Sequence, residues 1–176
     1  IFTTLSSCAS RQLEEVTFRR ATISVPELMA TAGKYFRKVY KGNKAHIDFK
    51  IQLLEGRITG DWNQLRFLLE NLIDEACSVT LDGAVCLSAR EDGEFIRFLF
   101  TDMRREKTRE ELNQLFYPDL SRMTAGEKGE LYGTEYLVCK QIIRDHDEFA
   151  GRRGCRINAE PGKEGGFTIY FTLPKK

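Results

Sequence analysis

One long segment, residues 61–76, restricts the fold of this chain more than any other. Its apolar residues recur at intervals of three and four positions, which places them on one face of a helix: Leu65, Leu68, Leu69, Leu72, Ile73 and Ala76. Asp61, with Gln64 three positions later, is suited to cap the N-terminus of that helix. A helix with a single apolar face must bury it, so the chain needs a second layer of structure to pack against it.

Two further helices are predicted. One begins after Ser24, because Ser24 and Glu27 have the spacing of a capping box and Pro26 suits a first helical turn. Gly42 is suited to end it. The other is expected over residues 133–146. All three predicted helices are amphipathic, so they can cover one face of a sheet.

Strand patterns lie between these helices. Alternating or β-rich runs predict strands at residues 16–23, 46–51, 84–90, 94–101, 155–159 and 167–173. The dipeptide Asp92-Gly93 predicts a hairpin between two of them. The order of elements predicts an α/β (α+β) two-layer sandwich: a mixed, mostly antiparallel sheet of about five strands, with three main helices on one face.

Composition narrows the class of protein. The chain has 176 residues, enough for one domain, and 41% of them are hydrophobic, which excludes a disordered chain. Its 27 Lys and Arg against 26 Asp and Glu leave a net charge of +1, so we expect no nucleic-acid partner and no direct contact with a membrane. Five widely spaced cysteines without a Cys-x-x-Cys motif favour free thiols over a zinc site.

The two ends of the chain are expected to differ in role. Residues 1–15 are polar, with scattered apolar positions, and we expect them to be the end of a helical segment or a linker that precedes the domain of residues 16–176. Because the chain begins at Ile1, it is expected to be a piece of a longer protein. Residues 103–133 form a long polar connection, which inside a compact domain is usually functional.

Polar residues mark a candidate site within this framework. Asn71 and Glu75 are one turn apart on the helix of residues 61–76, and Asp102 follows a strand. With the segments 60–76 and 140–174, this pattern resembles the ATP-binding catalytic domain of sensor histidine kinases, which shares its fold with gyrase, Hsp90 and MutL. The resemblance covers about residues 16–174.

The resemblance implies ATP and Mg²⁺ as ligands. It assigns the Mg²⁺ position to Asn71 and Glu75, with Glu75 standing where the family has a second asparagine. It implies that Asp102 accepts a hydrogen bond from the adenine amino group. Gly133 would receive the phosphates at the start of the last helix. Thr168 would support the adenine aspartate, although Phe167 fills the usual threonine position.

The chain also departs from the family pattern at both glycine boxes. The run Met103-Arg104-Arg105-Glu106 replaces Gly-x-Gly, and Glu135 replaces the glycine two positions after Gly133. A carboxylate about 4 Å from a phosphate would cost roughly 4 kcal/mol at an effective dielectric constant of about 20. Arg104 and Arg105 are candidate phosphate contacts. The alternation of charge favours a different role, in which they pair with acidic residues on a solvated helix (Glu106, Glu110 and Glu111).

These departures favour a degenerate catalytic domain, with weak or no ATP binding and a regulatory or interaction role in signal transduction. The alternative is a divergent active kinase that binds Mg-ATP and phosphorylates a histidine on its dimerisation helices. A third possibility is a stand-alone partner-binding domain like the anti-sigma switch kinases. The resemblance implies as partners its own dimerisation helices, a response regulator and a second copy in a homodimer, in the cytoplasmic part of a sensor.

Overall fold

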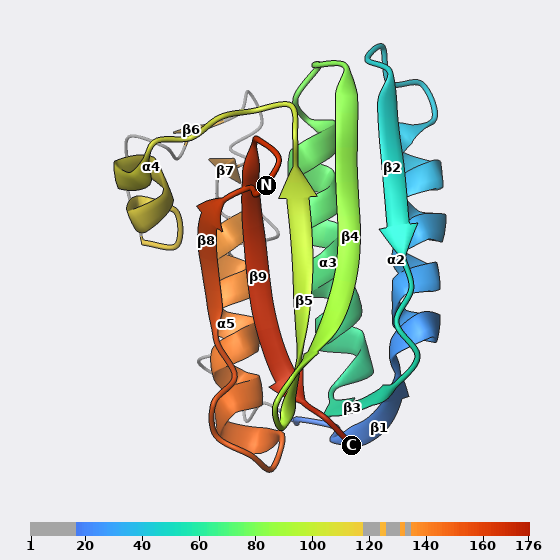
Figure 1. The fold of residues 1–176 in the computed structure, drawn as a ribbon, viewed down its shortest axis with the longest axis vertical. Coiled ribbons are helices and arrows are strands. Elements are labelled where there is room, and N and C mark those ends of the chain that lie inside the picture. The colour runs from blue at the N-terminus through green and yellow to red at the C-terminus, as the bar shows by residue number, and fades with distance from the viewer. Residues whose placement is uncertain (1–16, 118–123, 126–130, 133–134) are drawn as a thin grey trace.

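The structure is a computed structural model, and it describes residues 17–117, 124–125, 131–132 and 135–176. A five-stranded sheet forms one layer (Figure 1). Its strands, in spatial order, are β2 (Ile47–Gln52), β4 (Gly83–Asp92), β5 (Phe95–Asp102), β9 (Phe167–Pro174) and β8 (Ile157–Pro161). Only the β2–β4 pair is parallel among these neighbours, so the predicted mixed, mostly antiparallel sheet is confirmed.

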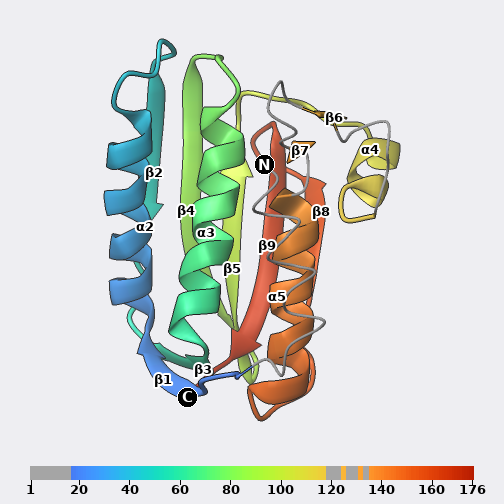
Figure 2. The same cartoon turned by 180° about the vertical axis from the view of Figure 1, so that it is seen from behind.

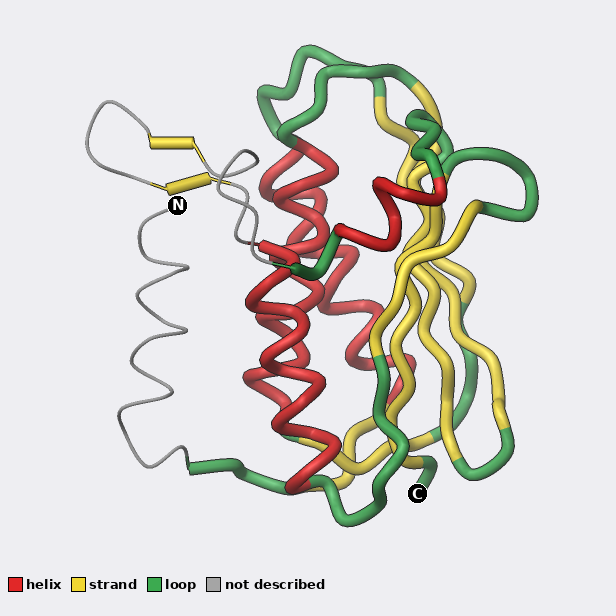
Figure 3. The backbone as a smooth tube through the Cα atoms, turned by 90° about the vertical axis from the view of Figure 1, so that its left-hand side faces the viewer, coloured by secondary structure: helices red, strands yellow, loops and turns green. Residues whose placement is uncertain are grey.

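Three helices form the second layer: α2 (Val25–Tyr40), α3 (Trp62–Cys77) and α5 (Glu135–Phe149). They run side by side across one face of the sheet and leave the other face open (Figures 2 and 3). A short fourth helix, α4 (Arg109–Gln114), packs beside β8 at the edge of the sheet. Of the helices in the described part of the chain, none combines the length and the hydropathy needed to cross a membrane.

The helices begin where side-chain caps allow. The Ser24 hydroxyl accepts from the Glu27 N–H at the start of α2, and the Asp61 carboxylate accepts from the Gln64 N–H at the start of α3. Each cap satisfies one N–H group that has no partner within the helix. Both predicted caps are therefore confirmed.

The core lies between the two layers. Every second residue of β5 and β9 faces the helices, and the rings of Phe98 and Phe171 stack there with centroids 5.1 Å apart. The leucine stripe of α3 is buried against them. The alternate residues of the same strands lie on the open face. Two consecutive residues at the end of a strand therefore have their side chains on opposite faces of the sheet.

The N-terminal part of the described chain differs from the prediction. The strand expected over residues 16–23 is only β1 (Ala21–Ser24), and it pairs with β3 (Arg57–Gly60), which the sequence pattern did not indicate. These two strands form a separate small sheet at one end of the helices. The segment expected at residues 1–15 lies outside the described residues.

Candidate functional site

The site centres on Asp102, the last residue of β5. Strand alternation turns this side chain toward the helices, where it lies at the C-terminal end of α3 and is 1% exposed. A buried carboxylate needs partners that replace its hydration. Here those partners come from the two residues that follow Met103.

Arg104 supplies three hydrogen bonds to Asp102. Its backbone N–H and its Nε donate to Oδ1 at 3.0 and 2.9 Å, and Nη2 donates to Oδ2 at 2.9 Å. The same guanidinium also donates to three backbone carbonyl oxygens at the end of α3 and just beyond it: Val79 and Leu81 at 2.9 Å and Ala76 at 2.6 Å. The Arg104 side chain is fully buried and ties β5 to the C-terminus of α3.

Arg105 links Asp102 to Glu75. Its Nε donates to Asp102 Oδ2 at 3.1 Å, while Nη1 and Nη2 donate to the two Glu75 carboxylate oxygens at 2.9 and 2.8 Å. The guanidinium lies 5.2 Å from the Phe167 ring centroid, within range of a cation–π contact. We call Glu75, Asp102, Arg104 and Arg105 the ion cluster; its formal charges balance.

The expected pairing of the two arginines with nearby acidic residues is wrong. The helix that would have aligned them begins only at Arg109, because Thr108 is its N-cap, with Glu111 completing the capping box. Arg104 and Arg105 precede it in an extended turn and reach back to the sheet and α3. Glu106 accepts instead from the Gly166 N–H at 2.8 Å.

The ion cluster shifts the pKa values of Asp102 and Arg105. Burial alone would raise the pKa of Asp102, but the hydrogen bonds from Arg104 and the two positive charges outweigh it and lower that pKa. Burial would lower the pKa of the Arg105 guanidinium, but Glu75 raises it above its usual value. Both shifts favour the charged forms of Asp102 and Arg105.

This shift predicts an acid-sensitive contribution to stability. Because the pKa of Asp102 is lower in the folded state, its contribution is complete above the usual value of 3.8 and is lost as the pH falls through the folded value. Urea unfolding of wild type and Asp102→Asn, measured from neutral pH into the acid range, checks this. The difference between their free energies of unfolding should become smaller as the pH falls below 3.8. A difference that stays constant with pH would contradict the assignment.

The remaining predicted site residues occupy different environments. Asn71 is buried, and its amide nitrogen donates to the Phe67 carbonyl oxygen of its own helix at 2.7 Å. The Thr168 hydroxyl lies 2.7 Å from the Thr101 hydroxyl, and both line the open face of the sheet. Gly133 lies outside the described residues. Glu135 begins α5, and its side chain also lies outside the described part.

Two aromatic residues near the ion cluster were not predicted from the sequence as part of the site. Phe167 lies under Arg105, as described above. Tyr136 is buried near the N-terminus of α5, edge-on to Phe116, with ring centroids 5.9 Å apart. Burial and the Glu75 charge raise the pKa of the Tyr136 hydroxyl well above its usual value. The only sequence signal for Tyr136 was its position three residues before Cys139 in an amphipathic run, and that spacing indicates a core residue.

The sandwich of sheet and three helices, with a buried aspartate at the end of β5 facing α3, defines a domain of the histidine kinase ATPase type. Residues 60–176 match the family described as histidine kinase-, DNA gyrase B-, and HSP90-like ATPase. The chain belongs to this family.

The chain is also similar to particular relatives. The adaptive-response sensory kinase SasA of Thermosynechococcus vestitus is 29% identical over 137 residues, which are 77% of this chain and 34% of SasA. The chain therefore spans about a third of the length of that curated relative.

Solved structures show the same fold. The catalytic domain of histidine kinase ThkA superimposes with a TM-score of 0.68 at 19% identity, over 89% of this chain and 96% of that one. ThkA in complex with the response regulator TrrA gives 0.74 at 18% identity, over 99% of this chain and 47% of that one. Full-length ShkA in complex with AMPPNP superimposes with a TM-score of 0.74 at 16% identity, over 98% of this chain and 35% of that one.

Proposed function

We propose that this domain is a catalytic-domain-like module of a two-component sensor kinase that acts without binding ATP. The observation that carries the proposal is the buried Arg104 guanidinium, which occupies the hydrogen-bonding groups of Asp102. A signalling role for such a domain rests on its surfaces and its connection to the rest of the protein, rather than on phosphoryl transfer.

The arrangement does not fit adenine or Mg²⁺. Both oxygens of Asp102 already accept from guanidinium groups, so a nucleotide amino group would have to displace Arg104 or Arg105. Both oxygens of Glu75 are held by Arg105. Separating a buried, hydrogen-bonded ion pair costs several kcal/mol, which is comparable to the roughly 4 kcal/mol that a millimolar dissociation constant represents.

The alternative is an active kinase domain. One observation favours it: Asp102 ends β5 and Asn71 lies on α3, and these are the residues that the family resemblance assigns to a nucleotide site. In that function Arg104 and Arg105 would have to leave Asp102 and turn toward phosphates. We favour the function without ATP because the Arg104 side chain makes five hydrogen bonds that such a movement would break.

The proposed partners are the domain's own dimerisation helices, a second copy in a homodimer and a response regulator, with the domain placed on the cytoplasmic side. Similarity to SasA and to the ThkA complex with TrrA supports this assignment. Contacts between the first described residues and the helices also support it. The Arg19 N–H donates to Asp61 at 2.9 Å, and the Phe18 ring lies edge-on to His146 at 4.8 Å, so residues entering the domain are attached to α3 and α5.

Calorimetric titration with ADP and with Mg-AMPPNP tests the proposal. We expect no heat from the wild type at millimolar nucleotide. Arg104→Gly, alone and with Glu135→Gly, removes the buried guanidinium and restores family glycines, and we expect it to bind detectably if it remains folded. Arg66→Ala, which removes an exposed arginine of α3, is the matched control and should behave as wild type. Mg-dependent micromolar binding by the wild type would overturn the proposal.

A further inference from the structure

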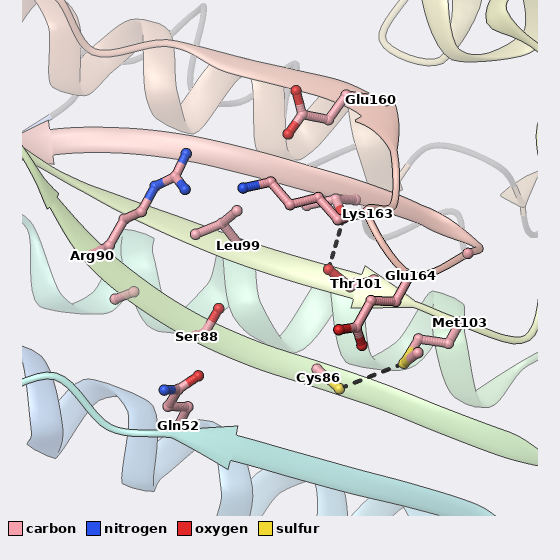
Figure 4. Close-up of a pocket in the computed structure, with 13 residues that line it drawn as sticks. Gln52, Cys86, Ser88, Arg90, Leu99, Thr101, Met103, Glu160, Lys163 and Glu164 are labelled. Atoms are coloured by element: carbon pink, nitrogen blue, oxygen red, sulfur yellow. Dashed lines mark hydrogen bonds between the residues drawn. The ribbon is translucent and has the colours of Figure 1, made fainter.

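The open face of the sheet carries a hollow of about 430 Å³, on the side opposite the helices (Figure 4). We propose that this hollow binds a small zwitterion of the free amino-acid class. The inference does not depend on the proposed function, because the hollow and the ion cluster lie on opposite faces of the sheet. Its volume is within the range of small-molecule sites.

The hollow exists because small side chains are adjacent across neighbouring strands. Cys86 of β4 is paired with Thr101 of β5, and Thr101 with Thr168 of β9. Ser88 of β4, opposite Leu99, extends this floor by one more row. Open sheet faces often carry larger aromatic or long polar side chains, whereas Cys86, Ser88 and Thr101 are short, so the centre of this face is low.

Longer side chains form the walls. The turn between β8 and β9 supplies Lys163 and Glu164, and Met103 follows the end of β5. The Cys86 thiol lies 4.0 Å from the Met103 sulfur. Leu99, Met103 and Cys86 give the hollow an apolar part beside the hydroxyl groups of Ser88 and Thr101, so it suits a ligand with both apolar and polar groups.

The two cations of the hollow are separated from Glu164. The Arg90 and Lys163 side chains extend toward one another over Leu99, whereas the Glu164 carboxylate lies at the other end, beside Met103 (Figure 4). Within the described part of the chain, neither Arg90 nor Lys163 is in an ion pair. Arg97, the cross-strand neighbour of Arg90, contrasts with it: Arg97 pairs with Asp92 at 3.0 Å and lies over the Tyr170 ring at 4.5 Å.

This separation of charge selects the ligand class. A carboxylate between Arg90 and Lys163 would accept charge-assisted hydrogen bonds, and an ammonium group would pair with Glu164. Glu160 also lines the hollow, with its carboxylate at the end where Arg90 and Lys163 lie (Figure 4). A ligand with only negative charge would leave the two carboxylates without a partner and be repelled by them. A ligand with only positive charge would be repelled by Arg90 and Lys163. A zwitterion with an apolar side chain over Leu99 and Met103 would pair its carboxylate with Arg90 and Lys163 and its ammonium group with Glu164.

An occupant would also lie close to the ion cluster. Thr101 and Met103 face the hollow, whereas Asp102 and Arg104, which alternate with them, face the helices. The Glu106 carboxylate joins this segment to the β8–β9 turn through the Gly166 N–H. The two surfaces therefore share one piece of backbone.

NMR titration of isotope-labelled protein with each standard L-amino acid, at millimolar concentration, tests the proposal. We expect at least one to shift amide resonances of β4, the end of β5 and the β8–β9 turn together. The N-acetyl derivative and the amide of that amino acid, which each lack one charge, should bind about tenfold more weakly or worse. Arg90→Ala should weaken binding by a similar factor, and Arg97→Ala should leave it unchanged.

A second variant tests the location without changing charge. Ser88→Leu fills the floor of the hollow and should abolish the shifts, with the fold checked by the unchanged resonances of the helices. The proposal is overturned if no amino acid shifts these resonances, if the shifts persist in both Arg90→Ala and Ser88→Leu, or if the N-acetyl derivative binds as well as the parent amino acid.

Discussion

Asp102→Asn is expected to lower the free energy of unfolding by about 3–5 kcal/mol, because it removes one partner of a buried ion pair and leaves the other charge uncompensated. The side chains of Arg104 and Asp102 are 0% and 1% exposed, so water cannot replace the lost carboxylate. Asparagine has a similar shape but no charge, and only one of its two terminal atoms accepts hydrogen bonds. Urea unfolding at neutral pH, followed by circular dichroism, measures the loss.

The matched control is Asp92→Asn, which breaks a pair near the surface. Arg97 and Asp92 are 25% and 46% exposed, so the expected loss is below about 1 kcal/mol. Equal losses in the two variants would mean that the ion cluster contributes no more than a surface pair. That result would also weaken the argument that Arg104 resists displacement by a nucleotide.

Gly166→Ala is expected to destabilise the protein by about 3 kcal/mol or more, since backbone strain and a steric clash add together. Gly166 has φ +71°, where side chains are disfavoured. A Cβ atom there would overlap the Asp102 carbonyl oxygen and lie 2.6 Å from Met103 Cα. Because both obstacles are backbone atoms, the β8–β9 turn must move away from the end of β5. Urea unfolding measures the loss, and hydrogen exchange at the Gly166 N–H measures the movement.

Gly93→Ala separates the two causes. Gly93 has φ +61° in the β4–β5 hairpin, but a Cβ atom there meets nothing within 4 Å. We therefore expect the free energy of unfolding to fall by about 1 kcal/mol, from backbone strain alone. If Gly166→Ala cost no more than Gly93→Ala, the close approach of the two strand ends would not be a constraint on this site.

The ion cluster places a side chain of the chain itself at the position that the family resemblance assigns to a ligand. A guanidinium donates hydrogen bonds through a planar group, as the adenine amino group does, and it carries a charge that suits a buried aspartate. Arg104 also joins β5 to the end of α3 through carbonyl oxygens. We infer that the arginine stabilises this corner of the domain without any ligand.

Much of the architecture could be predicted from the sequence because the signals are local. The stripe of α3 follows from a period of 3.6 residues, the caps at Ser24 and Asp61 from side chains three positions away, and the β4–β5 hairpin from Asp92-Gly93. Strand β3 was missed because its four residues, Arg57–Gly60, are too few to show a period. Its pairing with β1 depends on contacts more than thirty positions apart in the chain.

The candidate site was also predicted only where its signals are local. The spacing of Asn71, Glu75 and Asp102, which is typical of this family, is visible in the sequence alone. The pairing of Arg105 with Glu75, thirty positions away, and the position of Thr168 on the open side of the sheet depend on the folded chain. The physical reason is that helix and strand periods act between near neighbours, whereas the partner of a charged side chain is set by which distant segments packing brings together, and burial then makes that partner obligatory.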